Sequence, residues 1–354
     1  MTAASPSAVG AVSRRTANEA FYRAVVAAGR APSAHNAQPW RWRLGDGVLD
    51  LFLDPGQTSE FADLAGRLAT ISCGAALHHA RLTLAARGWR VTVTRRPDAA
   101  DPAHLARLHI DGAAPVSPDT ANLARAIKLR HTDLRPVTGG PIEPRRLRTI
   151  CTAFEAQHVR LAVLRPDQIL GLTVATANAD NTEPANAQWH TELALWAGGD
   201  RIAGALDDLR LPIARGEHDR AATFAVLHGP HDRNLDWLHA GEALSAGSLV
   251  ATGLKVSILP FSAPIEHADA REILRRAVPD LGYPYLMMRL GHHATETARA
   301  AHTSRLTAVQ TIERPDHADT PWAASHSGIH ENLRATPPSA TPTTALLVPE
   351  PRPR

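Results

Sequence analysis

Two segments of this chain begin with the same small-residue motif and continue in the same way. Gly74-Ala-Ala-Leu77 and Gly241-Glu-Ala-Leu244 each belong to an apolar helical pattern that runs into an alternating, strand-like segment. The two glycines are 167 positions apart by subtraction of their numbers. A repeat over such a distance is typical of two related structural units in one chain. We therefore expect a pseudo-dimer, in which two similar halves are joined in a single polypeptide.

Hydrophobic periodicity predicts helices and strands throughout most of the chain. The predicted helices cover 18–30, 64–87, 119–129, 143–157, 167–179, part of 186–211, 235–250 and 270–277. The predicted strands cover 40–44, 48–54, 89–94, 104–110, 160–164, 223–227, 254–260 and 285–290. The first two strands flank a Gly-Asp-Gly loop and form a predicted hairpin.

A polar loop connects the first predicted helix to the first predicted strand. Gly29 and Pro32 end the helix, since glycine favours a helix C-terminus and proline lacks an amide hydrogen. The loop then offers a hydroxyl, an imidazole and two carboxamides. Amide side chains carry both donors and acceptors, so such a loop can match the edge of a flat heterocycle. On local chemistry alone, an ordinary polar loop is the favoured explanation, since loops of this composition are common.

Composition excludes several classes of function. The formal net charge is +3 with interspersed acidic and basic residues, and no basic run carries aromatic residues as a nucleic-acid-binding surface would. Cys73 and Cys151 lie in apolar surroundings and are predicted to be inert thiols, with no disulfide and no metal site. No apolar run reaches the ~18 residues of a membrane span. We expect a soluble cytoplasmic protein that binds neither nucleic acid nor a membrane.

The ten residues from Ala31 to Trp40, Ala-Pro-Ser-Ala-His-Asn-Ala-Gln-Pro-Trp, resemble the flavin-contacting motif of the nitroreductase family. They resemble its Acg-like branch from actinobacteria more closely, and the resemblance extends over roughly residues 18–310. It implies an α+β fold with antiparallel-rich sheets flanked by helices, in two intertwined pseudo-symmetric halves. The expected divisions are a flexible lead at 1–15, a first half at 16–118, a second half at 119–310 with a lid insertion at 178–216, and a disordered tail at 311–354.

The resemblance also implies one FMN per chain, bound between the halves. The first half supplies the loop and the second half supplies a basic turn for the phosphate, where arginine offers a planar fork of donors. The residues expected to contact the cofactor are Pro32, Ser33, His35, Asn36, Gln38, Arg130, Thr132, Arg135, Lys255 and Arg305. For His35, a purely structural role in the loop is an equal alternative. Two positions depart from the family pattern. Leu134 replaces an arginine, and Lys255, opposite Gly88 in the repeat, would either steady a negative flavin charge or crowd the ring.

Three functions follow as hypotheses. In the first, NADPH or NADH reduces the flavin, and a nitroaromatic or quinone reoxidises it in a ping-pong cycle. The flavin carries this chemistry, so no side chain is predicted as acid, base or nucleophile. In the second, the protein stores flavin beneath the lid with little turnover. In the third, motivated by Leu134 and Lys255, the chain is a scaffold without flavin. The internal pseudo-dimer would be a monomer that can self-associate further.

Overall fold

The computed structural model describes residues 14–45, 47–57, 66–133, 137–169, 221–262, 265, 268–292 and 303–313. All of them belong to a unit spanning Met1–Pro315, and a second unit, Asp316–Arg354, lies outside the described residues. The lid insertion at 178–216 and the predicted helices at 167–179 and 186–211 fall wholly or largely outside them as well.

The first half contains helices on either side of an antiparallel hairpin and a second pair of strands. Its elements are α1 (Arg14–Ala28), the short helix η1 (Ala34–Asn36), β1 (Trp40–Gly45), β2 (Val48–Leu53), the short helix η2 (Pro55–Gln57), α2 (Arg67–Ala85), β3 (Trp89–Arg95) and β4 (His104–Ala113). Gly47, at φ +77°, provides the left-handed residue that the β1–β2 turn requires.

The second half repeats this order after a connecting helix, α3 (Pro118–Ala126). Ser117 begins α3 by accepting a hydrogen bond from the amide of Thr120 on its side-chain oxygen, at 3.1 Å. The further elements are α4 (Pro144–Glu155), β5 (Arg160–Val163), β6 (Thr223–Gly229), α8 (Asn234–Gly253), β7 (Ser257–Phe261), α10 (Ala268–Ala277), β8 (Tyr283–Gly291), α11 (Ala308–Thr311) and β9 (Ile312–Glu313).

The strands form two sheets with the same connectivity. One sheet has the order β3-β4-β2-β1-β9 and the other has the order β5-β6-β8-β7. Read from its other end, the second sheet is β7-β8-β6-β5. This matches β3-β4-β2-β1 of the first sheet when four is added to each strand number. Every pairing among the described strands is antiparallel except that of β9, which lies parallel to β1. The predicted α+β class with antiparallel sheets flanked by helices is confirmed.

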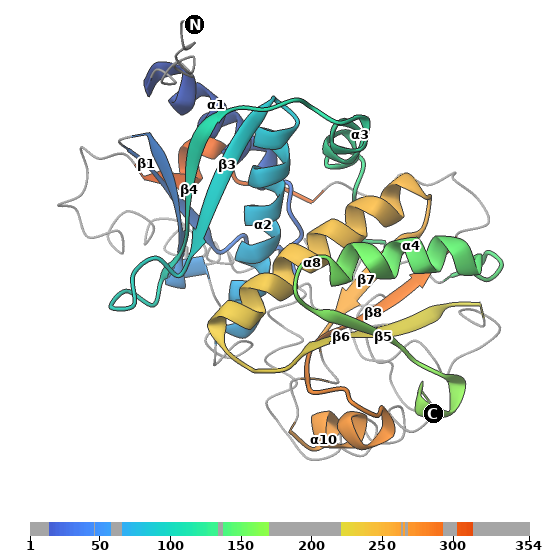
Figure 1. Ribbon diagram of the computed structural model, residues 1–354. Helices are drawn as coiled ribbons and strands as arrows, with labels where there is room; N and C mark the ends of the chain where they lie inside the picture. Colours follow the sequence, from blue (N-terminus) through green and yellow to red (C-terminus); the bar gives the residue numbers. More distant parts are fainter. Residues whose placement is uncertain are drawn as a thin grey trace, which may run out of the picture. The chain divides into compact units, whose positions relative to one another are not determined.

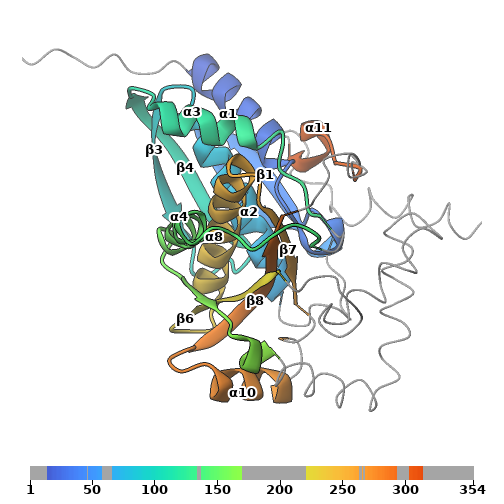
Figure 2. The same ribbon diagram turned by 90° about the vertical axis from the view of Figure 1, so that its right-hand side faces the viewer.

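The central helices α2 and α8 each cover one sheet and pack against each other (Figure 1). One apolar core joins α2 to the sheet of β1, β2 and β4, and a second joins α8 to the sheet of β6, β7 and β8. After a rotation of the view, α2 and α8 still lie between the two sheets (Figure 2). The helix pair is therefore the main contact between the halves.

The contact between α2 and α8 follows the repeat seen in the sequence. A Cβ atom added to Gly74 would lie 2.1 Å from the carbonyl oxygen of Leu238, and one added to Gly241 would lie 1.8 Å from that of Ile71. Leu238 and Ile71 differ by the same 167 positions as the two glycines. Each helix thus approaches the other through equivalent residues, and only glycine permits that distance.

The two halves also share the turn that follows the central helix. Gly88, after α2, has φ +79°, and Lys255, after α8, has φ +57°. Lys255 therefore occupies the left-handed position that a glycine fills in the first half. As a result, β7 begins at Ser257, three residues later than the predicted strand start at 254.

The predicted boundaries at the two ends of the fold need correction. Helix α1 begins at Arg14, inside the predicted flexible lead, and residues 311–313 are ordered instead of starting a tail. Ile312 and Glu313 pair with Trp42 and Arg43 of β1, and Arg43 forms an ion pair with Glu313 at 3.0 Å. A two-residue strand has too little periodicity to be recognised, and it exists here because β1 offers an open edge.

Candidate functional site

The loop between α1 and β1 has an unusual backbone. His35, Asn36 and Gln38 all have positive φ angles, of 49°, 58° and 52°. Such angles cost energy for residues other than glycine and persist where the surroundings impose them. Two hydrogen bonds do so here. The amide of Gln38 donates to Oγ of Ser33 at 3.1 Å, and the amide of Ala34 donates to Oγ of Ser72 on α2 at 3.1 Å.

A segment from the far end of the chain, residues 303–307, closes onto this loop. Nδ2 of Asn36 donates to the carbonyl oxygen of Ser304 at 3.0 Å. The amide of Leu306 donates to Oε1 of Gln38 at 2.9 Å. Both carboxamides predicted to face the ligand therefore also hold the C-terminal segment in place.

Arg305 is fixed by the same loop. Its Nη1 donates to the carbonyl oxygen of Ala31 at 3.0 Å and to Oδ1 of Asn36 at 2.9 Å. Burial and the nearby charge of Arg30 lower the pKa of Arg305. A guanidinium that is held by neutral oxygens and repelled by a second arginine keeps its positive charge available to a ligand.

Arg130 belongs to the same cluster of positive charge. Burial and the charge of Arg305 lower the pKa of Arg130 to about 10, so it remains protonated at neutral pH. Its Nε is buried and has no hydrogen-bond partner in the described part of the chain. No carboxylate among the described residues contributes to the pKa shift of Arg130 or Arg305. Cations that are partly withdrawn from water are normally paired, so this arrangement of two partly buried arginines is complementary to an anion.

The structure therefore brings together most of the predicted residues. Ser33, Asn36, Gln38, Arg130 and Arg305 meet around the loop, which His35 also shapes through its backbone. Pro32 is buried at the base of the loop, and Thr132 is partly buried beyond Arg130.

Two predicted residues stand apart from this set. Arg135 and its neighbour Leu134 lie outside the described residues. Lys255 is exposed in the turn between α8 and β7, where its carbonyl oxygen accepts a hydrogen bond from Nδ1 of His292 at 3.0 Å. The assignment of Lys255 to the flavin stays a prediction.

Three polar residues in the central helices were not predicted for the site or its surroundings. Ser72 supports the loop, as described above, and His79 on α2 is buried near Arg130. Glu242 on α8 is fully buried, with Arg95 donating from Nε and Nη2 at 2.7 and 2.8 Å and Arg81 pairing with the same carboxylate. Hydrophobic periodicity predicts that such positions are buried in the core, but it does not predict which polar groups they contact.

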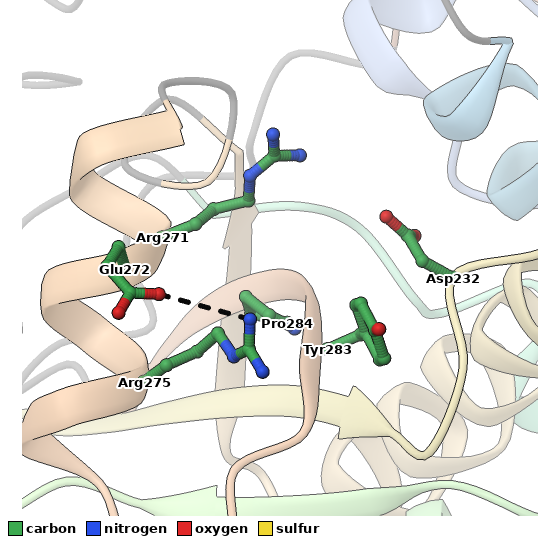
Figure 3. Close-up of a pocket in the computed structure, with 6 residues that line it drawn as sticks. All are labelled: Asp232, Arg271, Glu272, Arg275, Tyr283 and Pro284. Carbon is green, nitrogen blue, oxygen red and sulfur yellow. Dashed lines mark ion pairs between the residues drawn. The ribbon is translucent and has the colours of Figure 1, made fainter.

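A cavity elsewhere in the second half contains none of the predicted residues. It has a volume of about 230 Å³ and is lined by Asp232, Arg271, Glu272, Arg275, Tyr283 and Pro284 (Figure 3). Arg275 pairs with Glu272 at 3.9 Å and lies over the ring of Tyr283 at 5.3 Å. Its charges are thus largely matched, in contrast to the cluster at Arg130.

The described residues contain neither a membrane-spanning helix nor a metal-binding cluster. None of their helices combines the length and apolar character needed to cross a membrane. Within the same residues there is no group of three or more His, Cys, Asp or Glu side chains placed to hold a metal ion.

Comparisons with solved structures found nitroreductases at low similarity. The FMN- and NADPH-dependent nitroreductase NfnB from Sphigopyxis sp. strain HMH is 16% identical, with a TM-score of 0.41, and the match covers 54% of this chain and 98% of that one. A nitroreductase with bound FMN from Bacteroides fragilis is 15% identical, with a TM-score of 0.38, over 51% of this chain and 93% of that one.

Relatives in sequence are much more similar. No family model matches the chain. A Mycobacterium tuberculosis protein with the provisional name NAD(P)H nitroreductase Rv3131 is 32% identical over 311 residues, which are 81% of this chain and 89% of the relative. The provisional NAD(P)H nitroreductase acg of the same organism is 30% identical over 293 residues, covering 76% of this chain and 87% of the relative. Such identity over most of both sequences shows that the chain belongs to the nitroreductase family, in its Acg-like branch.

Proposed function

We propose that this protein binds FMN between its two halves and acts as an NAD(P)H-dependent oxidoreductase on a small acceptor, such as a nitroaromatic or a quinone. The observation that carries the proposal is the pair of partly buried arginines, Arg130 and Arg305, beside a loop of carboxamides, where no carboxylate of a described residue contributes to the pKa of either arginine. The names of the relatives and the FMN bound by solved nitroreductases support the choice of cofactor.

The residues present fit FMN on two counts. Nε of Arg130, which no described residue contacts by a hydrogen bond, and the guanidinium of Arg305 suit a phosphate dianion, which accepts several hydrogen bonds from arginine. The left-handed backbone at His35, Asn36 and Gln38 turns donors and acceptors of the loop in varied directions, as a heterocycle with both kinds of group requires.

The chain's own residues would bind and orient the cofactor. Arg130 and Arg305 would hold its phosphate, and the loop from Ser33 to Gln38 would hydrogen-bond the ring. When bound, FMN supplies the electron transfer between a nicotinamide and the acceptor. The protein contributes the position of the ring, since the loop is held by Ser72 of the buried helix α2 and by residues 304–306.

We further propose that the two halves derive from an ancestral homodimer that became one polypeptide. Three features support this proposal: the matching strand orders, the equivalent glycine contacts at a constant spacing of 167 positions, and the addition of β9 to the sheet of the other half. The ligand-facing loop exists in the first half, while in the second half α4 is followed by only a few residues before β5. One flavin per chain follows.

The test begins with the purified full-length protein. An absorption spectrum and chromatography of the released ligand would identify FMN and give its ratio to the chain. Anaerobic addition of NADPH or NADH should then bleach the flavin, and a nitroaromatic or quinone should restore the colour. A protein that stays colourless after dialysis against FMN would contradict the proposal.

A flavin store is the second candidate, and the same experiment separates it from the enzyme. A protein that retains FMN but is not reduced by either nicotinamide would have the storage role. The lid on which that role depends, 178–216, lies outside the described residues, and the arginine cluster serves both roles equally.

A further inference from the structure

His79 is buried in the wall of the proposed phosphate site. It lies on α2 with no exposed surface, and its ring differs in direction from that of its neighbour His78, whose Nδ1 lies 2.8 Å from Oγ of Ser245 on α8. Nδ1 of His79 lies 3.3 Å from the carbonyl oxygen of Ala27, near the end of α1. A carbonyl oxygen only accepts, so Nδ1 carries the hydrogen.

The other ring nitrogen of His79 is left without a partner by the residues that the structure describes. Nε2 is buried and makes no hydrogen bond within the described residues. Burial, followed by the positive charge of Arg130, lowers the pKa of His79 well below its usual value. The ring is therefore neutral, and with the hydrogen on Nδ1 its Nε2 presents a lone pair that can accept a hydrogen bond.

Arg130 reaches the same region from the end of α3. Its amide donates to the carbonyl oxygen of Ala126 at 2.8 Å. Ala126 and Ile127 share an apolar cluster with Leu82, one turn beyond His79, and with Ala27, whose carbonyl oxygen His79 contacts. Nε of Arg130 is a buried donor and Nε2 of His79 is a buried acceptor, and neither has a partner in the described ranges. Both residues thus lie on elements packed around one small cluster.

We propose that His79 is a positioning residue for Arg130: its neutral Nε2 accepts the Nε hydrogen of Arg130, directly or through one water, when an anion is bound. Arg130 would then turn its two Nη groups toward the ligand. This inference rests on the proposed function, because it assumes that the anion is the phosphate of FMN. It names a residue that touches neither the phosphate nor the ring and acts through Arg130 alone.

Two substitutions separate the two nitrogens of His79. In His79→Asn, the amide occupies the region of Nδ1, so a donor to Ala27 is kept and the acceptor at Nε2 is lost. In His79→Gln, the longer side chain places its amide oxygen near the position of Nε2, so the acceptor is kept. The two amides have the same chemistry and differ by one methylene group, which makes each the control for the other.

Binding of FMN and of riboflavin to the full-length protein provides the readout. We expect His79→Asn to weaken FMN binding about tenfold or more, because a hydrogen bond to a charged group is lost. Riboflavin has no phosphate, so its binding should be unchanged. His79→Gln should bind FMN within about twofold of the wild type. Equal affinities in the two variants, or an equal loss for riboflavin and FMN, would overturn the proposal.

A spectroscopic measurement on the wild type covers the case in which a variant does not fold. With ¹⁵N-labelled histidine, the Nε2 resonance of His79 should have the shift of an unprotonated nitrogen and should move upfield when FMN or inorganic phosphate is added. A proton on Nε2, or a resonance that ignores both additions, would overturn the role of His79 while FMN binding by the wild type remains. A wild type that binds neither FMN nor phosphate would instead overturn the proposed function, and this inference with it.

Discussion

Gly74 and Gly241 face each other where α2 and α8 cross, so closely that a Cβ atom on Gly74 would lie 3.0 Å from Cα of Gly241. We expect Gly74→Ala and Gly241→Ala each to lower the free energy of unfolding by at least about 3 kcal/mol, because the added methyl group meets backbone atoms that cannot yield easily. Gly253→Ala, at the end of α8 with nothing within 4 Å, is the matched control and should be near neutral. Urea unfolding measures all three, and equal stabilities would contradict the close approach.

In the protein without ligand, the Arg130 side chain should lower the free energy of unfolding. Its substitution by Met removes a partly buried cation, whose buried Nε has no partner among the described residues, and a repulsion with Arg305. We therefore expect Arg130→Met to leave the free energy of unfolding unchanged or raise it by about 1 kcal/mol, while FMN binding is lost. Arg125→Met, on the exposed face of α3, should change neither property. Thermal unfolding and flavin titration of both variants check this, and a strongly destabilised Arg130→Met with intact flavin binding would refute it.

Glu242 should be among the most sensitive charged residues in the described part of the chain. Its buried carboxylate pairs with Arg81 and Arg95 across the two halves, and Glu242→Gln would leave two guanidiniums without their counter-charge. The expected loss in unfolding free energy is about 3 kcal/mol or more. Glu272→Gln, which breaks pairs on the surface of α10, should cost less than about 1 kcal/mol. Similar losses at both positions would argue against the buried network.

His78 should make stability depend on pH in the mildly acidic range. Burial, then the charge of Arg81, lowers its pKa from 6.5 to about 4. Between these values the unfolded chain binds the proton and the folded chain does not, so stability is greatest above pH 6.5 and falls as the pH drops toward 4. The loss is at most about 3 kcal/mol, since His78 keeps some exposure.

The variant His78→Gln checks this assignment. It should retain less of the fall in unfolding free energy between pH 6.5 and 4, measured by urea unfolding at a series of pH values. An unchanged slope in the variant would assign the titration to other groups, of which the buried His79 is the nearest along the chain.

Periodicity predicted most of the fold because most elements are long enough to repeat a pattern. The hairpin of β1 and β2, the central helices and the strands β3, β4, β6 and β8 were all expected within a few residues of where they lie. The exceptions depend on tertiary contacts. Strand β9 forms only because β1 has a free edge, and Lys255 adopts a left-handed conformation because the turn after α8 repeats that of Gly88.

The site was predictable in part, for a similar reason. The loop residues and the two arginines carry a motif that is visible in one sequence, and the structure brings Asn36, Arg130 and Arg305 together. The polar groups behind them could not be found in this way. Ser72 and His79 lie within an apolar helix, and their roles depend on partners 38 and 52 positions away.

The position of Arg305 near the end of the described chain determines when its contact with the loop can form during synthesis. The loop that it braces is made early in synthesis, yet the brace itself comes some 270 residues later. While the chain is being synthesised, the loop therefore lacks this cation until almost all of the described residues have been made. If Arg305 holds a cofactor phosphate as proposed, that contact forms last, and a fragment that ends before Arg305 would lack it.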